Sequence, residues 1–388
     1  MATQYYRPDA APQVVVPPPQ VSRDQRYLFN PVVDFICLGG SSLIILPLIL
    51  MVPVTGYQEQ VAGTMLIIAH LINHPHFAHS YQIFYRGFRI KAFTADLGRA
   101  MQLRYVFSGI VVPAMLAAFF AFCLLTADAR LLGYAANVMA LFVGWHYVKQ
   151  GYGMLMVDAA LKRQYFNASE KKVLLVNCYA VWVAAWLGFN DAIRERKLWG
   201  LQYFTFDFPD PIVIVSTVVA AATGIAAVGM LATRWRSTGR LPVNGVIAYA
   251  VSLYIWLWFV TVHPLWLLVA PALHSLQYLV VVWRFQTNYQ KAQLAASEPE
   301  ASSLARRLVG NKLLGHLILF TLSGVILGFV GFWGLPIMLN ATIPYDDAVF
   351  GSTLFLFVGW IFINVHHYFL DTVMWRRENP DTRRYLFG

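Results

Sequence analysis

The sequence has few charged residues and almost no cysteine. Of its 388 residues, 12% are charged and only three are cysteines. The cysteines lie in three separate apolar stretches, which excludes a disulfide framework and a cysteine-rich zinc site. Cys37, Cys123 and Cys178 are therefore expected to be small core residues. The scarcity of charge also excludes an ordinary soluble domain.

Apolar sequence dominates instead. Hydrophobic residues make up 58% of the chain, and the mean hydropathy is +0.55. About ten stretches have the roughly 20 apolar residues that a helix needs to cross about 30 Å of hydrocarbon. They lie near residues 33–54, 62–85, 105–127, 132–158, 172–190, 211–232, 243–262, 264–285, 312–334 and 348–370. The sequence predicts an all-α fold, a polytopic transmembrane helical bundle of about ten spans.

Basic residues predict the orientation of this bundle. The chain has 29 Lys and Arg against 19 Asp and Glu, a net charge of +10. The basic residues are concentrated in alternate loops, which the positive-inside rule places on the cytoplasmic side. Both termini are therefore expected in the cytoplasm, in an integral protein of a bacterial inner (plasma) membrane. Because the membrane accounts for the charge, no nucleic-acid partner is expected.

The predicted organisation is one membrane domain with two short ends. Residues 1–30 are rich in proline and lack the pattern of a cleavable signal peptide, so they are expected to form a disordered cytosolic leader. Residues 31–376 form the transmembrane helical domain with a buried histidine cluster. Residues 377–388 form a cytosolic C-terminal tail.

The stretch that is most costly to place in a membrane is residues 70–79. It contains four histidines and Pro75 within an apolar run. An imidazole inside hydrocarbon is expensive unless it faces protein, a cavity or a metal, so it indicates function by default. Proline removes a backbone donor and disfavours the helical conformation of the preceding residue. We therefore expect the helix to kink or break at Pro75, inside a buried pocket.

Other predicted spans offer histidines at a similar depth, in or near the cytoplasmic half of the bilayer. A metal site is expected there, with candidate ligands His76, His146, His274, His367, His366, His74 and His79. Three polar residues stand four positions after a histidine and so share its helix face, namely Gln150, Tyr278 and Asp371. Gln150 and Asp371 could bond the second nitrogen of a ligating imidazole. Imidazole-rich sites suit iron, copper, zinc or nickel, and haem is the alternative.

Four short motifs follow one another over residues 70 to 376. They are Pro75-His76-Phe77, Trp145-His146-Tyr147, His274-Ser275-Leu276-Gln277-Tyr278 and His367-Tyr368-Phe369-Leu370-Asp371. In order and type they resemble the membrane β-carotene 15,15′-dioxygenases of bacteria and archaea, the family related to bacteriorhodopsin-related protein. The sequence departs from that pattern at Tyr278, where the family has a second histidine.

The resemblance implies a non-haem Fe(II) oxygenase. Its iron ligands would be His76, His146, His274 and one of His366 or His367. Dioxygen would react there with a lipid-soluble, carotenoid-like substrate that enters sideways from the membrane lipid. Tyr278 and Asp371 are the candidate catalytic residues beside the metal.

Three other functions are compatible with intramembrane histidines. A di-iron lipid hydroxylase or desaturase would also use them, although its usual histidine boxes are not reproduced. A haem-bearing electron carrier with quinone nearby would need a histidine pair at matching depth. A transporter would use the broken second span as its substrate site.

Overall fold

The computed structural model describes residues 26–387, except residues 54–55, 95–96, 193–195, 199–200, 259–262, 264 and 298–302. Nearly every described element is a helix, which confirms the all-α prediction. The described strands are β1 (Arg196–Leu198) and β2 (Leu201–Tyr203), which pair antiparallel as one short hairpin.

The helices follow one another with short connections, and several are joined by π-helical turns, labelled η. The first are α1 (Pro31–Phe35), η1 (Ile36–Gly40), α2 (Ser41–Met51), α3 (Gln58–Ile68), η2 (Ala69–Asn73), α4 (His74–Tyr85) and α5 (Phe88–Phe93). The middle ones are α6 (Arg99–Val106), η3 (Phe107–Val111), α7 (Val112–Leu125), α8 (Ala129–Leu161), α9 (Ala168–Ala192), α10 (Asp210–Thr238), α11 (Val243–Ala250) and η4 (Val251–Trp258). The last are α12 (Trp266–Ser297), α13 (Ser303–Phe329), η6 (Val330–Gly334), α14 (Leu335–Thr342), α15 (Asp347–Phe350), α16 (Leu354–Met374) and α17 (Pro380–Leu386).

Eight helical segments of the described chain are long and apolar enough to cross a membrane. They coincide with eight of the expected spans, and they indicate an integral membrane protein. The other two expected spans are helical as well. Residues 58–85 run continuously through α3, η2 and α4, and residues 243–258 form a shorter apolar helix from α11 and η4.

Of the kink or break expected at Pro75, the break is wrong. His74 keeps right-handed helical backbone angles, φ −65° and ψ −42°, and Pro75 lies in the first turn of α4. The π-helical turn η2 directly precedes that turn, and the same order recurs at η3 with Pro113 and at η6 with Pro336. A π-turn widens the helix where proline lacks a donor and its ring would clash with the carbonyl four residues earlier. The chain therefore passes each proline without leaving the helix.

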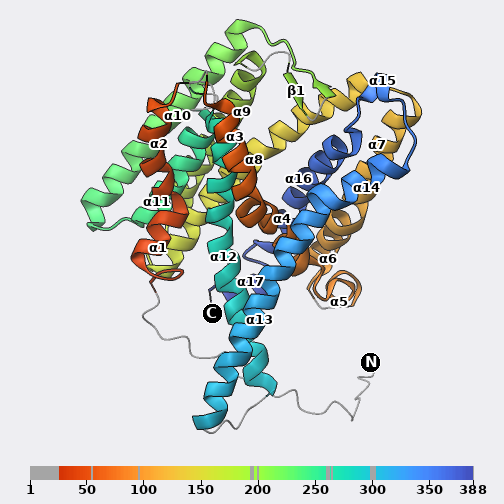
Figure 1. The fold of residues 1–388 in the computed structure, drawn as a ribbon. Coiled ribbons are helices and arrows are strands. Elements are labelled where there is room, and N and C mark those ends of the chain that lie inside the picture. The colour runs from red at the N-terminus through yellow and green to blue at the C-terminus, as the bar shows by residue number, and fades with distance from the viewer. Residues whose placement is uncertain are drawn as a thin grey trace, which may run out of the picture.

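Burial separates central from peripheral helices. Within the most apolar window of each span, 67% of α16 and 61% of α12 is buried, against 11% of α10 and 17% of α13. Helix α16 packs on both α4 and α8, and α12 packs on η2 and α4. These four helices therefore form the core, while α10 lies on the outside next to α9 and α13 lies against α4 (Figure 1).

The C-terminal segment packs against the bundle. In Figure 1, α5 and α17 lie towards one end of the bundle, and β1 and α15 lie at the other. Arg284 on α12 donates from Nε to the main-chain oxygen of Leu386, at 3.0 Å, and from Nη1 to that of Tyr27, at 2.9 Å. Lys91 forms a 2.7 Å ion pair with Asp381. Residues 1–25 of the predicted leader lie outside the described residues.

Candidate metal centre

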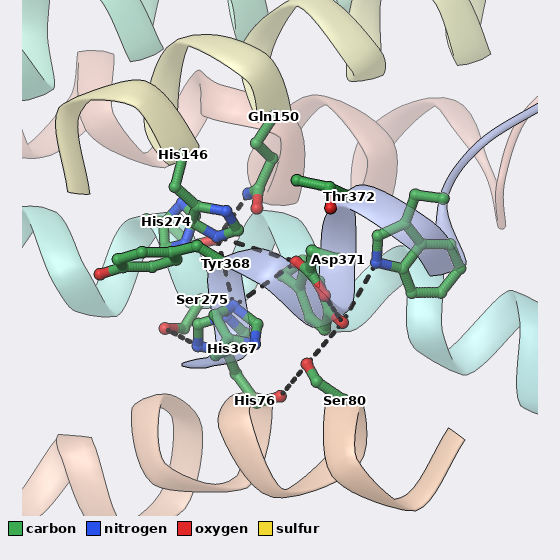
Figure 2. A network of polar contacts seen from close by, with 12 residues as sticks. His76, Ser80, His146, Gln150, His274, Ser275, His367, Tyr368, Asp371 and Thr372 are labelled. Atoms are coloured by element: carbon green, nitrogen blue, oxygen red, sulfur yellow. Dashed lines mark hydrogen bonds and ion pairs between the residues drawn. The ribbon is translucent and has the colours of Figure 1, made fainter. Parts of the chain in front are cut away.

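Four histidines from four different helices meet in the core of the bundle. His76 comes from α4, His146 from α8, His274 from α12 and His367 from α16 (Figure 2). His76 and His367 are completely buried, and the other two are at most 6% exposed. Burying so many polar rings together in a membrane protein is costly, so the arrangement calls for a compensating partner.

Three of these rings point the same nitrogen at one another. Nε2 of His367 lies 3.0 Å from Nε2 of His76 and 3.3 Å from Nε2 of His146. The ligand atoms of this histidine triad all lie within 4.8 Å of one another. When two imidazole nitrogens bind one metal ion, each metal–nitrogen distance is about 2.0–2.1 Å. The two nitrogens are then about 2.9 Å apart at an octahedral nitrogen–metal–nitrogen angle and about 3.4 Å apart at a tetrahedral one. The two short separations therefore match those of ligands on a single ion.

The hydrogen bonds of His76 set its tautomer. Its Nδ1 lies 3.0 Å from Oγ of Ser275. The single hydroxyl proton of Ser275 goes to one of two carbonyl-type oxygens, each 2.7 Å away, which are the main-chain oxygen of Pro271 and Oδ1 of Asn73. Nδ1 of His76 must then carry the proton and donate to Ser275. Nε2 is left with a lone pair, as a metal ligand requires.

Asp371 lies at the edge of the triad. Its Oδ2 is 3.5 Å from Nε2 of His367 and 3.8 Å from Nε2 of His146. Its Oδ1 accepts a 2.9 Å hydrogen bond from the hydroxyl of Tyr278, and Tyr278 also contacts Oγ of Ser80 at 2.6 Å. Both predicted catalytic residues are therefore adjacent to the triad.

His274 is close to the triad but is not part of it. Its ring centroid is 5.2 Å from that of His76 and 4.8 Å from that of His146. Its Nδ1 is buried and has no hydrogen-bond partner within the described part of the chain. Gln150, which we expected to bond His146, donates instead to the main-chain oxygen of His274 at 3.0 Å and to the side chain of Gln277 at 2.8 Å. That expectation was wrong, because the amide reaches across to α12 rather than along its own helix.

The remaining candidate histidines face other partners. His366 bonds the carbonyl oxygen of Ser108 through Nε2 and the hydroxyl of Tyr81 through Nδ1, each at 2.9 Å. His79 bonds Gln82 at 2.7 Å. His74 stacks on a phenylalanine of η6, with ring centroids 4.4 Å apart. The structure therefore does not bring these three rings into the cluster, and of the pair His366 and His367 only His367 faces it.

Two contacts of Tyr278 are not among the sequence predictions. Ser80 stands four residues after His76, the same spacing that pointed to Gln150, Tyr278 and Asp371, so the same rule could have found it. Trp375 stands four residues after Asp371, and its indole nitrogen donates to the Tyr278 hydroxyl at 3.2 Å.

Comparisons with known proteins identify no relative. No protein-family model matches the chain, and no curated protein and no solved structure is significantly similar to it. The motif resemblance described above and the geometry of the site are therefore what bears on function.

Proposed function

We propose that this chain is an integral membrane non-haem iron oxygenase that acts on a lipid-soluble, carotenoid-like substrate. The observation that carries the proposal is the convergence of three buried Nε2 atoms, 3.0 and 3.3 Å apart, from three helices. Imidazole ligands suit iron, and a small ligand set leaves positions open on the ion. When bound, such an iron would supply the activation of dioxygen.

The site favours a bare ion over haem. The two axial ligands of a haem lie on opposite faces of the macrocycle, which separates them. The ring centroids of His146 and His274, the pair expected for a haem, are 4.8 Å apart. The Nε2 atoms of His76 and His367 are in direct contact, so a porphyrin has no space between either pair. The electron-carrier alternative therefore has less support than the oxygenase.

The other two alternatives also lose support. Within the part of the chain that the structure describes, one group of at least three His, Cys, Asp or Glu residues could hold a metal. A di-iron centre needs more ligands than this triad. A transporter would use a discontinuous helix as its substrate site, whereas residues 58–85 stay helical through Pro75.

The chain's own residues would hold the ion and exclude water. His76, His146 and His367 would be the ligands, and Ser275 fixes the orientation of the His76 ring. Tyr147 packs on His274 with ring centroids 4.3 Å apart. Tyr368 likewise packs on His146, with centroids 4.6 Å apart. Both tyrosines are buried, so their rings shield the cluster from solvent.

We also propose the full topology of about ten spans, with both termini in the cytoplasm of a bacterial inner membrane. The helix of residues 58–85 and the helix of residues 243–258 would be the two additional spans. Basic loops support this orientation. Examples are residues 86–104, which contain α5, and residues 376–384, which include the first residues of α17. These two helices lie towards the same end of the bundle (Figure 1).

Metal content of single variants tests the proposal. The full chain is purified in detergent, reconstituted anaerobically with Fe(II) and analysed for iron. We expect His76→Gln, His146→Gln and His367→Gln each to lose the iron. His79→Gln and His366→Gln are matched controls, because these histidines are buried but bonded elsewhere, and they should retain it. Full iron content in all three triad variants would refute the metal site.

Substrate is tested separately in a carotene-producing bacterial host. Expression of the wild type should convert carotene to a cleavage product such as retinal, and His146→Gln should not. Unchanged carotene with an iron-loaded protein would argue for another lipid.

A further inference from the structure

We infer that Asp371 is a fourth ligand of this metal ion, and that Tyr278 is the positioning residue that turns the carboxylate towards it. The inference rests on the proposed metal site. Tyr278 stands where the family that the motifs resemble has a histidine, and here it would position the carboxylate rather than bind the metal. The inference also predicts a donor set of three nitrogens and one oxygen.

Asp371 faces the ring nitrogens of His367 and His146 that would bind the metal. A carboxylate that only supports a metal-bound histidine bonds the ring nitrogen that does not bind the metal. Here the three rings face one another through their Nε2 atoms, and Oδ2 of Asp371 lies 3.5 and 3.8 Å from Nε2 of His367 and His146. The carboxylate therefore lies on the same side as an ion between those nitrogens. No described contact joins it to Nδ1 of either ring.

The hydrogen bonds of Tyr278 orient the carboxylate of Asp371. The indole N–H of Trp375 can only donate, so Tyr278 accepts that bond, at 3.2 Å. The carboxylate of Asp371 only accepts, so Tyr278 directs its one proton to Oδ1, at 2.9 Å. The hydroxyl of Ser80, 2.6 Å from that of Tyr278, occupies another position around the same oxygen. With Oδ1 held in this way, Oδ2 is the oxygen left for the histidines (Figure 2).

The buried negative charge of Asp371 needs a cation beside it. Asp371 is 9% exposed, and the basic side chains within 4 Å of its carboxylate, among the described residues, are His146 and His367. An imidazole that binds a metal is neutral, so neither ring supplies a positive charge. A buried carboxylate without a cationic partner is costly, and a divalent cation beside it would remove that cost. The same negative charge would partly neutralise the ion.

The donor set has a consequence for metal choice. Carboxylate and imidazole together suit iron and manganese, whereas soft ions such as Cu(I) prefer sulfur ligands. Tyr278 does not replace the family histidine as a ligand, because its oxygen is surrounded by the groups of Ser80, Trp375 and Asp371. The carboxylate takes the fourth position instead.

Cobalt(II) binding tests the inference, because Co(II) has visible bands that report its ligands. The full chain in detergent is titrated with Co(II) as wild type, Asp371→Asn and Tyr278→Phe. Asp158→Asn and Tyr249→Phe are matched controls, since both residues are buried and bonded away from the triad. We expect Asp371→Asn to weaken Co(II) binding by more than about 100-fold and to change the visible bands. Tyr278→Phe should weaken binding by about 10–100-fold, the range for loss of a supporting hydrogen bond.

The outcomes separate the two claims. A wild type that binds no Co(II), Fe(II) or Mn(II) overturns the proposed function and this inference together. A wild type that binds Co(II), with Asp371→Asn unchanged in affinity and bands, overturns this inference alone.

A measurement on the wild type covers the case in which Asp371→Asn does not fold. Infrared difference spectra are recorded on adding Co(II) to protein with 13C-labelled aspartate carboxylates. A metal-induced shift of an isotope-sensitive carboxylate band supports the ligand assignment, and its absence in metal-bound protein contradicts it.

Discussion

The close approach of α13 to α4 leaves no space for a side chain at Gly328. A Cβ added there would lie 2.8 Å from the carbonyl carbon of His74 and 2.9 Å from its carbonyl oxygen and Cβ. Ordinary contacts begin near 3.4 Å, so the two helices would have to separate by about 0.6 Å in a core with little free volume. Because His74 is two residues before His76, this packing also fixes the position of one triad member.

We predict that Gly328→Ala lowers the free energy of unfolding by about 1–3 kcal/mol relative to Gly315→Ala, the usual cost of an overpacked contact. Gly315 lies on the same helix, and apart from its own helix backbone no atom of the described residues lies within 4 Å of a Cβ added there. Both substitutions gain the same helix propensity, about 1 kcal/mol, so the difference between them isolates the clash. Gly328→Ala should also bind Co(II) more weakly than Gly315→Ala.

The comparison is made by SDS titration of the detergent-purified chain, with helix content followed by circular dichroism. Equal midpoints for the two variants would refute the view that contact at Gly328 sets the spacing of α13 and α4.

The buried Arg284, the metal site and the membrane topology can each be tested separately. Arg284→Gln removes a buried cation that bonds the main chain of Leu386 and Tyr27, so the free energy of unfolding should fall by about 2 kcal/mol. Protease should also cleave the C-terminal segment faster, and cleavage at the wild-type rate would contradict this. Co(II) at 100 times its dissociation constant should stabilise the wild type by about 2.7 kcal/mol and leave His367→Gln unchanged, which denaturation with and without metal checks. Reporter fusions should place residue 387 in the cytoplasm and residue 344 on the opposite side, and the reverse result would refute the proposed orientation.

The sequence predicted those features that depend on one helix at a time. Apolar runs of membrane length located eight helices that are apolar and long enough to cross a membrane. Depth along those runs pointed to seven histidines, four of which meet in the core, namely His76, His146, His274 and His367. Four-residue spacing pointed to Gln150, Tyr278 and Asp371, and the last two lie beside the triad. Each of these inferences needs only the period of a helix and the thickness of a bilayer.

Features that depend on how helices are rotated against one another could not be predicted in this way. His366 and His367 are adjacent, so they point about 100° apart on α16, and only packing decides which one faces α4 and α8. The break at Pro75 was mispredicted because a proline signals the missing donor but not the π-turn that accommodates it. The role of Ser275 depends on a contact between α12 and α4, which no local pattern reveals.

Iron content and the absorption spectrum of one sample test the central claim most directly. The wild-type chain is purified in detergent and reconstituted anaerobically with Fe(II), then washed free of unbound metal. The proposal predicts close to one iron per chain and no Soret band. An iron-free chain, or iron accompanied by a Soret band, would contradict a non-haem iron centre built on His76, His146 and His367.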